Sequence, residues 1–270
     1  MINKENYTLI TGSTGGLGGA FCKECLKDGQ NIIISGTNQT KLDNLKQSLK
    51  NVYPNLKILA KECNLALQES RNTLIDFIKD NNININCLIN NAGYISEGSF
   101  LNYSENDIIN TIRVNCEGTI NLTQKIISIR DKEQPLNIIT VSSLAANYPM
   151  PYMAIYAASK AFLKSFFTAI AYELKDENIF ITNVYPSGIP TTNAMQEAIR
   201  AQGFNGKITM ATPEFIAKGA LKASKKHKKE YIPKFINRFI RNISRPLSDI
   251  QLSKTVGRMW KKSQKKRNIK

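Results

Sequence analysis

A glycine-rich stretch near the amino terminus constrains the fold of this chain more than any other feature. Residues 11–18 are Thr-Gly-Ser-Thr-Gly-Gly-Leu-Gly, directly after the apolar run 7–11 and directly before a helical pattern. Gly12 permits a tight turn, Gly16 lets the backbone approach a pyrophosphate, and Gly18 permits close packing of the helix on the strand. The free N–H groups at the start of the helix then face the phosphates. The stretch predicts a strand–turn–helix unit that binds a dinucleotide.

Short apolar runs alternate with amphipathic segments from this unit to about residue 185. We expect further strands at 31–35, 56–60, 85–89, 136–141 and 179–185, and helices at 17–28, 39–50, 67–80, 104–130 and 152–175. Buried strands that alternate with helices are typical of a parallel sheet covered on both faces. The chain is therefore predicted to adopt an α/β, doubly wound Rossmann fold.

Charge divides the chain into two parts. Residues 222–270 contain seventeen Lys and Arg side chains against Glu230 and Asp249, whereas the rest of the chain has twenty basic and nineteen acidic side chains. The apolar content of 42% is enough for one large α/β domain. We therefore assign residues 1–221 to a Rossmann-fold domain and residues 222–270 to a basic, amphipathic C-terminal extension.

The cysteines and the apolar runs indicate the cellular compartment of the protein. No apolar run is long enough to span a bilayer, and the residues before the first strand lack the apolar stretch of a signal peptide. An odd number of cysteines is typical of reduced thiols, so we expect a cytoplasmic protein. Cys22-x-x-Cys25 lies on a predicted helix far from the only histidine, His227, which indicates structural thiols and no metal site. The five cysteines are Cys22, Cys25, Cys63, Cys87 and Cys116.

The end of the second strand indicates which nicotinamide cofactor is preferred. An acidic side chain at this position would bind the ribose 2′-hydroxyl of NAD(H). The sequence Ser35-Gly36-Thr37-Asn38 has no carboxylate to repel a 2′-phosphate, and it has no arginine to attract one. We expect NADP(H) to be preferred over NAD(H), with Thr37, Asn38 and Ser13 as the polar contacts.

Tyr156 and Lys160 form the most specific local signal for chemistry. They lie four residues apart on a predicted helix, so they share one face. A phenol has a pKa of about 10, and a cation within about 4–6 Å favours its ionised form. We expect Lys160 to lower the pKa of the Tyr156 phenol toward neutrality, where general acid–base catalysis works best.

From about residue 5 to residue 220 the chain resembles the classical short-chain dehydrogenases/reductases. The resemblance is carried by the glycine loop at 11–18, Asn90-Asn91-Ala92-Gly93, Val114-Asn115, Ser142-Ser143, Tyr156 to Lys160, and Pro186 to Thr191, in the order and spacing of that family. It implies a seven-stranded parallel sheet and hydride transfer between a nicotinamide nucleotide and a carbonyl or alcohol. The basic tail is similar to the C-terminal extension of a bacterial branch of the family.

The resemblance also implies a role for each matching residue. Tyr156 would be the general acid in reduction and the base in oxidation, and Ser143, thirteen residues earlier, would bind the substrate oxygen in preference to Ser142. Lys160 would bind the nicotinamide ribose, and Asn115 would hold a water that links Lys160 to solvent. The expected cofactor contacts are Gly12, Ser13, Thr14, Gly16, Leu17, Gly18, Thr37, Asn38, Asn64, Leu65, Asn91, Ala92, Gly93, Tyr156, Lys160, Pro186, Ile189 and Thr191.

The segment after the sixth strand departs from the family pattern. The family has Pro-Gly there, whereas this chain has Pro186-Ser187-Gly188, which adds a side chain where backbone passes near the nicotinamide. Residues 189–208 match the mobile substrate lid of the family. The lid determines substrate choice, and its sequence names no substrate.

The basic extension contains a second amphipathic pattern. Its apolar stripe is Ile232, Phe235, Ile236, Phe239, Ile240 and Ile243, which predicts a helix that ends at Pro246. The stripe fits packing on the domain or on a partner subunit, with the charges in solvent. It also fits contact of 231–267 with an anionic membrane at the inner face. Nucleic acid fits least, because the aromatic side chains lie on the stripe and not among the lysines.

The leading functional hypothesis is an NADP(H)-preferring reductase of a ketone or aldehyde, with lipid-like substrates included. The alternatives are a nicotinamide-nucleotide sensor without turnover and a membrane-surface binding protein on the same scaffold. The retained Tyr156 and Lys160 argue against the sensor. The resemblance implies a homodimer or homotetramer.

Overall fold

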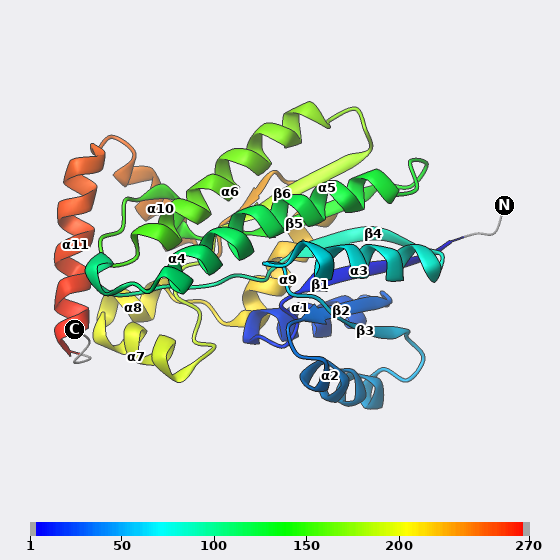
Figure 1. The fold of residues 1–270 in the computed structure, drawn as a ribbon. Coiled ribbons are helices and arrows are strands. Elements are labelled where there is room, and N and C mark those ends of the chain that lie inside the picture. The colour runs from blue at the N-terminus through cyan, green and yellow to red at the C-terminus, as the bar shows by residue number, and fades with distance from the viewer. Residues whose placement is uncertain (1–3, 267–270) are drawn as a thin grey trace.

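A seven-stranded parallel sheet forms the centre of the molecule (Figure 1). The computed structural model describes residues 4–266, so Arg267, the last residue of the segment assigned to membrane contact, lies outside the described residues. The strands are β1 (Glu5–Thr11), β2 (Ile32–Gly36), β3 (Ile58–Glu62), β4 (Ile83–Asn90), β5 (Leu136–Val141), β6 (Ile179–Val184) and β7 (Glu230–Tyr231). Their order in the sheet is β3-β2-β1-β4-β5-β6-β7, which confirms the predicted doubly wound fold.

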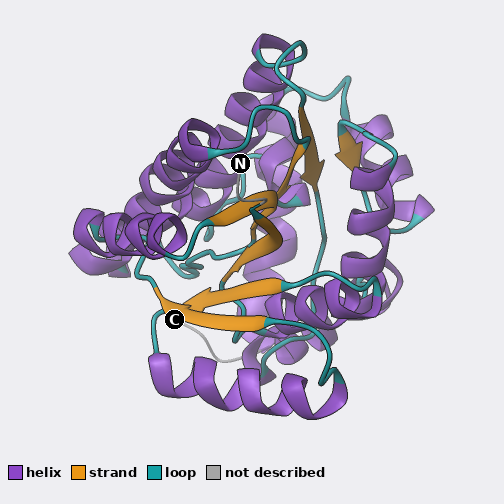
Figure 2. Ribbon diagram, turned by 90° about the vertical axis from the view of Figure 1, so that its right-hand side faces the viewer, coloured by secondary structure: helices purple, strands orange, loops and turns teal. Residues whose placement is uncertain are grey.

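Helices cover both faces of the sheet (Figure 2). They are α1 (Gly16–Lys27), α2 (Gln39–Val52), α3 (Gln68–Asp80), α4 (Glu105–Ile112), α5 (Thr119–Ile129), α6 (Ala154–Glu173), α7 (Asn193–Ala201), α8 (Phe204–Thr209), α9 (Pro213–Lys225), α10 (Phe235–Ser244) and α11 (Asp249–Lys266). The short helical turns are η1 (Phe100–Asn102), η2 (Arg113–Gly118) and η3 (Leu144–Asn147). None of the helices within residues 4–266 is long and apolar enough to cross a membrane.

Alternation along the strands divides the core into two apolar layers. Ile32 and Ile34 of β2 pack in the layer beneath α1 and α9, whereas Ile33 packs in the layer beneath α3, α5 and α6. Phe21 of α1 and Phe167 of α6 are fully buried, one in each layer. The continuous apolar strands of the sequence are therefore explained by burial on both faces of the sheet.

Two elements differ from the sequence-based expectation. The segment 104–130, expected as one helix, consists of α4, a π-helical turn at η2, and α5. The seventh strand lies at Glu230–Tyr231, where Asn183 pairs with Glu230 and Val184 with Tyr231. The sheet therefore continues past residue 221 into the basic extension.

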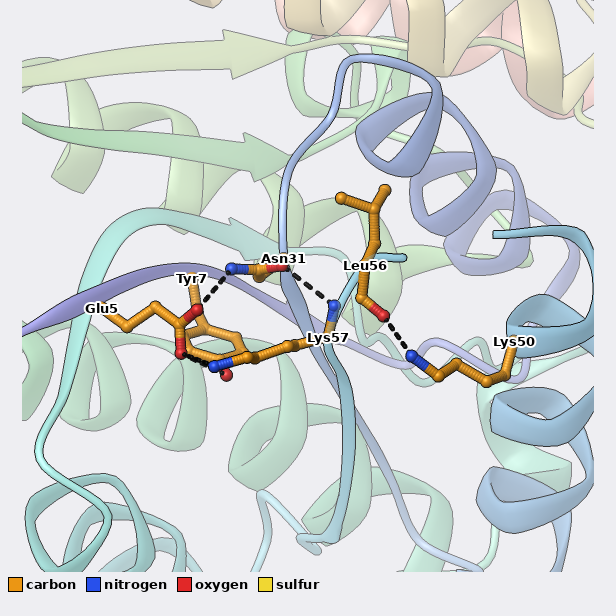
Figure 3. Close-up of polar contacts among 6 residues, drawn as sticks. All are labelled: Glu5, Tyr7, Asn31, Lys50, Leu56 and Lys57. Carbon is orange, nitrogen blue, oxygen red and sulfur yellow. Dashed lines mark hydrogen bonds and ion pairs between the residues drawn. The ribbon is translucent and has the colours of Figure 1, made fainter. Parts of the chain in front are cut away.

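The amino ends of the first three strands are held by polar contacts on one side of the molecule (Figure 3). The Glu5 carboxylate accepts hydrogen bonds from Asn31 Nδ2 at 3.2 Å and from Lys57 Nζ at 2.8 Å. The bond from Lys57 is the main cause that holds the pKa of Glu5 below its usual value. Lys50 Nζ donates to the Leu56 carbonyl at 2.7 Å and so ties the end of α2 to the approach of β3. These contacts fix the sheet at the end opposite to the carboxyl ends, where parallel sheets bind ligands.

Candidate active site

A cavity of about 480 Å³ lies at the carboxyl ends of β1 to β6. Strand order reverses between β1 and β4, and ligands of doubly wound sheets bind at this position. The cavity is lined by most of the residues predicted from the sequence: Gly12, Thr14, Gly16, Leu17, Gly18, Thr37, Asn64, Leu65, Asn91, Ala92, Gly93, Ser143, Tyr156, Lys160, Pro186, Ile189 and Thr191. The fold thus brings together segments that are up to about 180 residues apart in the chain.

Hydrogen bonds hold β1 and β4 together at the reversal of strand order. Asn91 Nδ2 donates to the carbonyls of Thr11 at 2.9 Å and Gly12 at 3.1 Å. In return, the Thr11 hydroxyl accepts from the backbone N–H groups of Asn91 and Ala92, both at 3.0 Å. The Asn-Asn-Ala-Gly motif therefore fixes the position of the glycine loop.

The glycine loop leaves bare backbone along the cavity wall. Gly12 has a φ of +65°, and a Cβ there would lie 2.9 Å from Ala92 Cα. A Cβ on Gly18 would overlap the Gly12 carbonyl, and one on Gly16 would lie 2.6 Å from Thr191 Cγ2. The first residue flanking α1 is Gly15, which makes no side-chain cap, and the first turn has no acidic residue. This bare helix start fits the pyrophosphate of a dinucleotide.

Three predicted site residues lie outside the cavity lining. Ser13 is fully buried, donates to the Ile10 carbonyl at 2.7 Å and accepts from the Ser35 N–H at 3.1 Å, so it supports the loop from behind. Asn38 caps α2 through a bond from the Lys41 N–H at 2.8 Å. Asn115 is also fully buried. Thr37 alone remains as the exposed polar side chain at the end of β2 that lines the cavity.

Lys160 lies beside Tyr156 in the cavity but bonds to the sheet. Its Nζ lies 5.8 Å from the centre of the Tyr156 ring and donates to the Val141 carbonyl at 3.0 Å. The side chain is 4% exposed, and this burial lowers the pKa of Lys160 to about 8. Among the residues that line the cavity, no other side chain is a lysine, arginine or carboxylate.

The pKa of Tyr156 differs from the sequence-based expectation. Burial raises the pKa of the phenol above its usual value, and an interaction with the Ser143 hydroxyl lowers it in part. The Lys160 ammonium group instead donates its hydrogen bond to the Val141 carbonyl. The expectation that Lys160 brings the pKa of the phenol toward neutrality is therefore wrong for the protein alone. Ser143, not Lys160, is the group that favours the phenolate.

Ser142 and Ser143 have different environments. Ser142 is buried, and its hydroxyl donates to the Lys160 carbonyl at 2.9 Å. Ser143 is half-buried at the start of η3, where it accepts from the Ala145 N–H at 3.1 Å and donates to the Pro186 carbonyl at 3.4 Å. The 3.4 Å bond is long, so the Ser143 hydroxyl is the freer of the two to bind another oxygen.

Asn115 lies in the π-helical turn η2, a type of turn that is frequent at functional sites. Its Oδ1 accepts from the Tyr94 N–H at 2.7 Å, and its Nδ2 donates to the Tyr94 carbonyl and to Ser159 Oγ, both at 2.9 Å. A Cβ on Gly93 would lie 3.3 Å from Lys160 Nζ and 3.5 Å from Asn115 Oδ1. The carboxamide thus holds the loop after β4 next to Lys160.

Arg71 is a supporting residue that sequence reasoning missed. It is 2% exposed, and its guanidinium donates to the Leu65 carbonyl, to Asn121 Oδ1 at 2.9 Å and to the Glu117 carboxylate at 2.7 Å. It therefore connects a cavity residue to the turn that carries Asn115. An arginine on an amphipathic helix is normally predicted to be at the surface, so the sequence gives no signal for this role.

Other residues that line the cavity were also not predicted. They flank the strand ends and the motifs, and the position next to a predicted motif is the signal that could have found them: Thr11, Gly15, Ser35, Gly36, Cys63, Tyr94, Ile95, Val114, Val141, Ser142, Ser187, Gly188 and Met195. Ile95, in the loop after β4, and Met195, in α7, are apolar and at least partly exposed, as is the predicted Ile189 after β6. They give the cavity an apolar wall.

Ser187, the departure from the family pattern, bonds to the basic extension. Its hydroxyl donates to the Thr209 carbonyl and accepts from Asn237 Nδ2 at 3.2 Å. Asn237 is fully buried. The additional side chain is therefore used to attach α10 to the segment after β6.

The last helix, α11, lies beside the predicted lid. It contacts α7, which belongs to the predicted lid at 189–208. A second cavity, of about 400 Å³, lies between α11 and the loops around Phe100 and Tyr152. Figure 1 shows α7, α8, α10 and α11 gathered at the same end of the molecule.

All five cysteines lie within the described residues, and all are buried and unpaired. Burial raises the pKa of the Cys22 and Cys87 thiols to about 12. Cys22 and Cys25 are both fully buried in α1. Because the thiolate is the reactive form, these groups are poor nucleophiles.

Known proteins with similar sequences include reductases of 3-oxoacyl compounds. The chain is 30% identical over 180 residues to the very-long-chain 3-oxoacyl-CoA reductase of Neurospora crassa, which covers 65% of this chain and 54% of that protein. It is 32% identical over 215 residues to the 3-oxoacyl-acyl-carrier-protein reductase FabG of Rickettsia typhi, which covers 78% of this chain and 85% of that protein. The chain thus spans little more than half of the length of the first of these relatives.

Solved structures show the same fold. A short-chain dehydrogenase of Sphingobium yanoikuyae in complex with NADPH has a TM-score of 0.75 at 20% identity, covering 89% of this chain and 93% of that chain. A short chain dehydrogenase/reductase of Burkholderia phymatum in complex with NAD has a TM-score of 0.78 at 17% identity, covering 92% and 95%. The family model of the short chain dehydrogenases matches residues 6–202. With the glycine loop, the Asn-Asn-Ala-Gly motif, and Tyr156 and Lys160 lining one cavity, the chain belongs to the short chain dehydrogenase family.

Proposed function

We propose that this protein is an NADP(H)-preferring reductase that converts a ketone or aldehyde, with lipid-like molecules included, to an alcohol. The observation that supports this most is the common cavity that is lined by the glycine loop, Ser143, Tyr156 and Lys160. A bound nicotinamide nucleotide supplies the hydride. The Gly12 to Gly18 loop and the bare start of α1 fit its pyrophosphate, and Thr37, Asn64 and Leu65 line the part of the cavity nearest β2 and β3.

The protein's own residues handle the oxygen and the proton. Ser143 donates a hydrogen bond to the substrate carbonyl oxygen, and Tyr156 gives that oxygen a proton in reduction. The raised pKa of the Tyr156 phenol keeps it protonated at neutral pH, which suits a general acid. Lys160, whose pKa is lowered to about 8, carries a proton that it can release near neutrality, and it would hold the ribose of the cofactor.

The substrate class is inferred from the wall of the cavity and from the relatives. Ile95, Ile189 and Met195 offer apolar surface to a substrate next to Tyr156. The relatives from N. crassa and R. typhi are named as reductases of 3-oxoacyl thioesters. A keto group on an acyl chain is therefore the first candidate.

The preference for NADP(H) is inferred from the end of β2. No carboxylate is among the residues that line the cavity, so nothing there repels a 2′-phosphate. Thr37 is exposed at this end of the cavity and can donate a hydrogen bond to a phosphate oxygen.

We further infer that the protein forms a homo-oligomer in a reducing compartment such as the cytoplasm. The outer faces of α4 and α6 expose Ile112, Phe162 and Tyr172, which are the kind of apolar surface that a second copy can cover. The five unpaired thiols fit a reducing compartment.

The test is oxidation of NADPH with a panel of carbonyl compounds that includes 3-oxoacyl thioesters, long-chain ketones and short aldehydes. Tyr156→Phe is expected to keep the affinity for NADPH and to lose turnover by a factor of about 10²–10⁴. Tyr172→Phe, an exposed residue of the same helix, is the matched control. Binding of NADPH without turnover on any carbonyl would favour the sensor, and full turnover in Tyr156→Phe would show that another group supplies the proton.

A further inference from the structure

Helix α10 packs its polar side against the domain. Asn237 Nδ2 donates to the carbonyls of Pro233 and Thr209, both at 2.9 Å. Arg241 forms an ion pair with Glu230 at 2.8 Å, and Ser244 Oγ donates to the Tyr148 hydroxyl at 3.3 Å. These polar contacts set the orientation of the helix about its axis.

Part of the apolar stripe of α10 is consequently left in solvent. Phe235, Phe239 and Ile243, spaced four residues apart, are 74%, 50% and 56% exposed. Leu247 and Ile250, which follow the helix, are also exposed. A helix of a globular protein normally turns its apolar stripe to the core, whereas in α10 Ile236 and Ile240 are half-buried and the rest of the stripe faces solvent. A row of exposed aromatic and aliphatic side chains marks an interaction surface.

The next helix, α11, supplies cations. Its buried residues are Leu252, Ser263 and Gln264, and it carries five exposed basic residues: Lys254, Arg258, Lys261, Lys262 and Lys265. Lys254, Arg258 and Lys261 also line the open second cavity beside the loops around Phe100 and Tyr152. The segment 234–265 as a whole has nine Lys and Arg side chains against one carboxylate, that of Asp249. Lys234, Arg238 and Arg245 lie on or beside α10, next to its exposed apolar residues.

We propose that α10 and α11 form a surface that attaches the protein reversibly to the anionic face of a lipid bilayer. Phe235, Phe239 and Ile243 enter the interface between headgroups and acyl chains, and the cations of α11 bind the anionic headgroups. This combination of an apolar stripe with flanking lysines and arginines is what interfacial helices use.

The positive charge of α10 and α11 favours an anionic bilayer as the binding partner over a second copy of the chain. An isologous contact through α10 would bring two strongly basic segments together, and like charges in contact oppose association. Anionic lipid instead neutralises each cation. Nucleic acid would also neutralise them, but it offers no apolar layer for Phe235, Phe239 and Ile243.

The attachment would place the site at the bilayer. Helix α10 contacts α8 and η3, and α11 contacts α7. The proposed surface therefore adjoins the substrate lid (Figure 1) and the turn that directly follows Ser143. A lipid-soluble substrate could then pass from the bilayer to the cavity. The attachment itself needs no catalysis, and its test measures binding alone.

The experiment is sedimentation of the full-length protein with vesicles of phosphatidylcholine, with and without phosphatidylglycerol, at low salt. We expect at least about tenfold more binding to the anionic vesicles and a marked loss of binding at high salt, because salt screens exposed charges. Two triple variants test the two helices: Phe235→Ser with Phe239→Ser and Ile243→Ser, and Lys254→Gln with Arg258→Gln and Lys262→Gln. All six side chains are exposed, so both variants should fold.

Lys23→Gln with Lys41→Gln and Lys79→Gln, on α1, α2 and α3, is the control with the same loss of charge. The triple variants in α10 and α11 are each expected to bind vesicles at least about tenfold less, while the control variant binds vesicles as the wild type does. The proposal fails if the wild type ignores anionic vesicles or if neither tail variant loses binding. It also fails if the protein binds duplex DNA more tightly than anionic vesicles at equal phosphate concentration. It fails likewise if the triple variant in α10 changes an oligomer to a monomer and leaves vesicle binding unchanged.

Discussion

The side chain of Asn115 and the backbone of Tyr94 exchange two hydrogen bonds, with the Tyr94 N–H donating to Oδ1 at 2.7 Å and Nδ2 donating to the Tyr94 carbonyl at 2.9 Å. The carboxamide pairs with a backbone segment as a neighbouring strand would. It holds the loop after β4 next to Lys160. No other contact described for that loop binds both the N–H and the carbonyl of one residue. The π-helical turn provides the position from which Asn115 reaches this loop.

Asn115→Ala is expected to displace this loop. It leaves the backbone groups of Tyr94 without partners, at a cost of about 1–3 kcal/mol in the free energy of unfolding. It should also lower kcat about tenfold or more, because small displacements of catalytic groups are costly. Urea unfolding and steady-state kinetics measure the two effects. Asn51→Ala, at an exposed position of α2, is the control, and equal behaviour of the two variants would contradict a positioning role for Asn115.

Gly18 and Gly19 offer a matched pair of substitutions in α1. A Cβ on Gly18 would overlap the Gly12 carbonyl, whereas a Cβ on Gly19 would lie 3.8 Å from the Ser13 carbonyl oxygen, an ordinary contact. Gly18→Ala should therefore distort the loop, cost about 1–3 kcal/mol in stability and weaken NADPH binding at least about tenfold. Gly19→Ala should stabilise the helix by about 0.5–1 kcal/mol. Thermal unfolding and titration with NADPH check both, and comparable losses in the two variants would refute the close-packing argument.

The lowered pKa of Lys160 predicts how the free energy of unfolding changes with pH. Its pKa falls from an ordinary value of 10.5 to about 8 in the folded protein, so the buried charge costs stability below pH 8. Between these values the unfolded chain binds a proton that the folded protein has released, and stability rises with pH as the penalty of about 3 kcal/mol disappears. Lys160→Met removes this penalty.

Between pH 7 and pH 10, the free energy of unfolding of the wild type should therefore rise relative to that of Lys160→Met. Parallel curves over that range would show that the burial of the ammonium group has no energetic consequence. Lys175→Met, at an exposed position just after α6, is the control. Urea denaturation at several pH values measures the difference.

Thr37→Asp tests the inferred cofactor preference. A carboxylate at the end of β2 would repel a 2′-phosphate and accept a bond from a free 2′-hydroxyl. NADPH binding should weaken at least about tenfold, and NADH binding should stay the same or improve. Thr40→Asp, in the first turn of α2 and outside the cavity, adds the same charge as a control. Unchanged binding of both nucleotides to Thr37→Asp would place the 2′ position elsewhere.

The sheet and the cavity residues could be predicted because local patterns carry them. Continuous apolar strands such as Ile32–Gly36 identify a sheet buried on both faces, and each motif directly follows a strand end. The π-helical turn could not be predicted, because one additional residue per turn leaves the apolar pattern of 104–130 almost unchanged. The pKa of Tyr156 could not be predicted either, since it depends on burial and on the interaction with the Ser143 hydroxyl.

The orientation of α10 in the basic extension could not be predicted from the sequence either. The stripe from Phe235 to Ile243 predicted a helix correctly, but a stripe does not say whether the domain or another surface covers it. The polar contacts of Asn237 and Arg241 decided this, and they depend on the additional Ser187 and on Glu230 of β7. Residues far apart in the chain determined the orientation of α10.

The contact of α11 with α7 has a consequence for biosynthesis. Domains form during translation in the order in which the chain emerges, amino terminus first. The dinucleotide half, β1 to β4 with its glycine loop, is complete long before residues 249–266 leave the ribosome. The contact between α7 and α11 can form only after residues 249–266 have emerged, so the region around the predicted lid is completed later than the dinucleotide half.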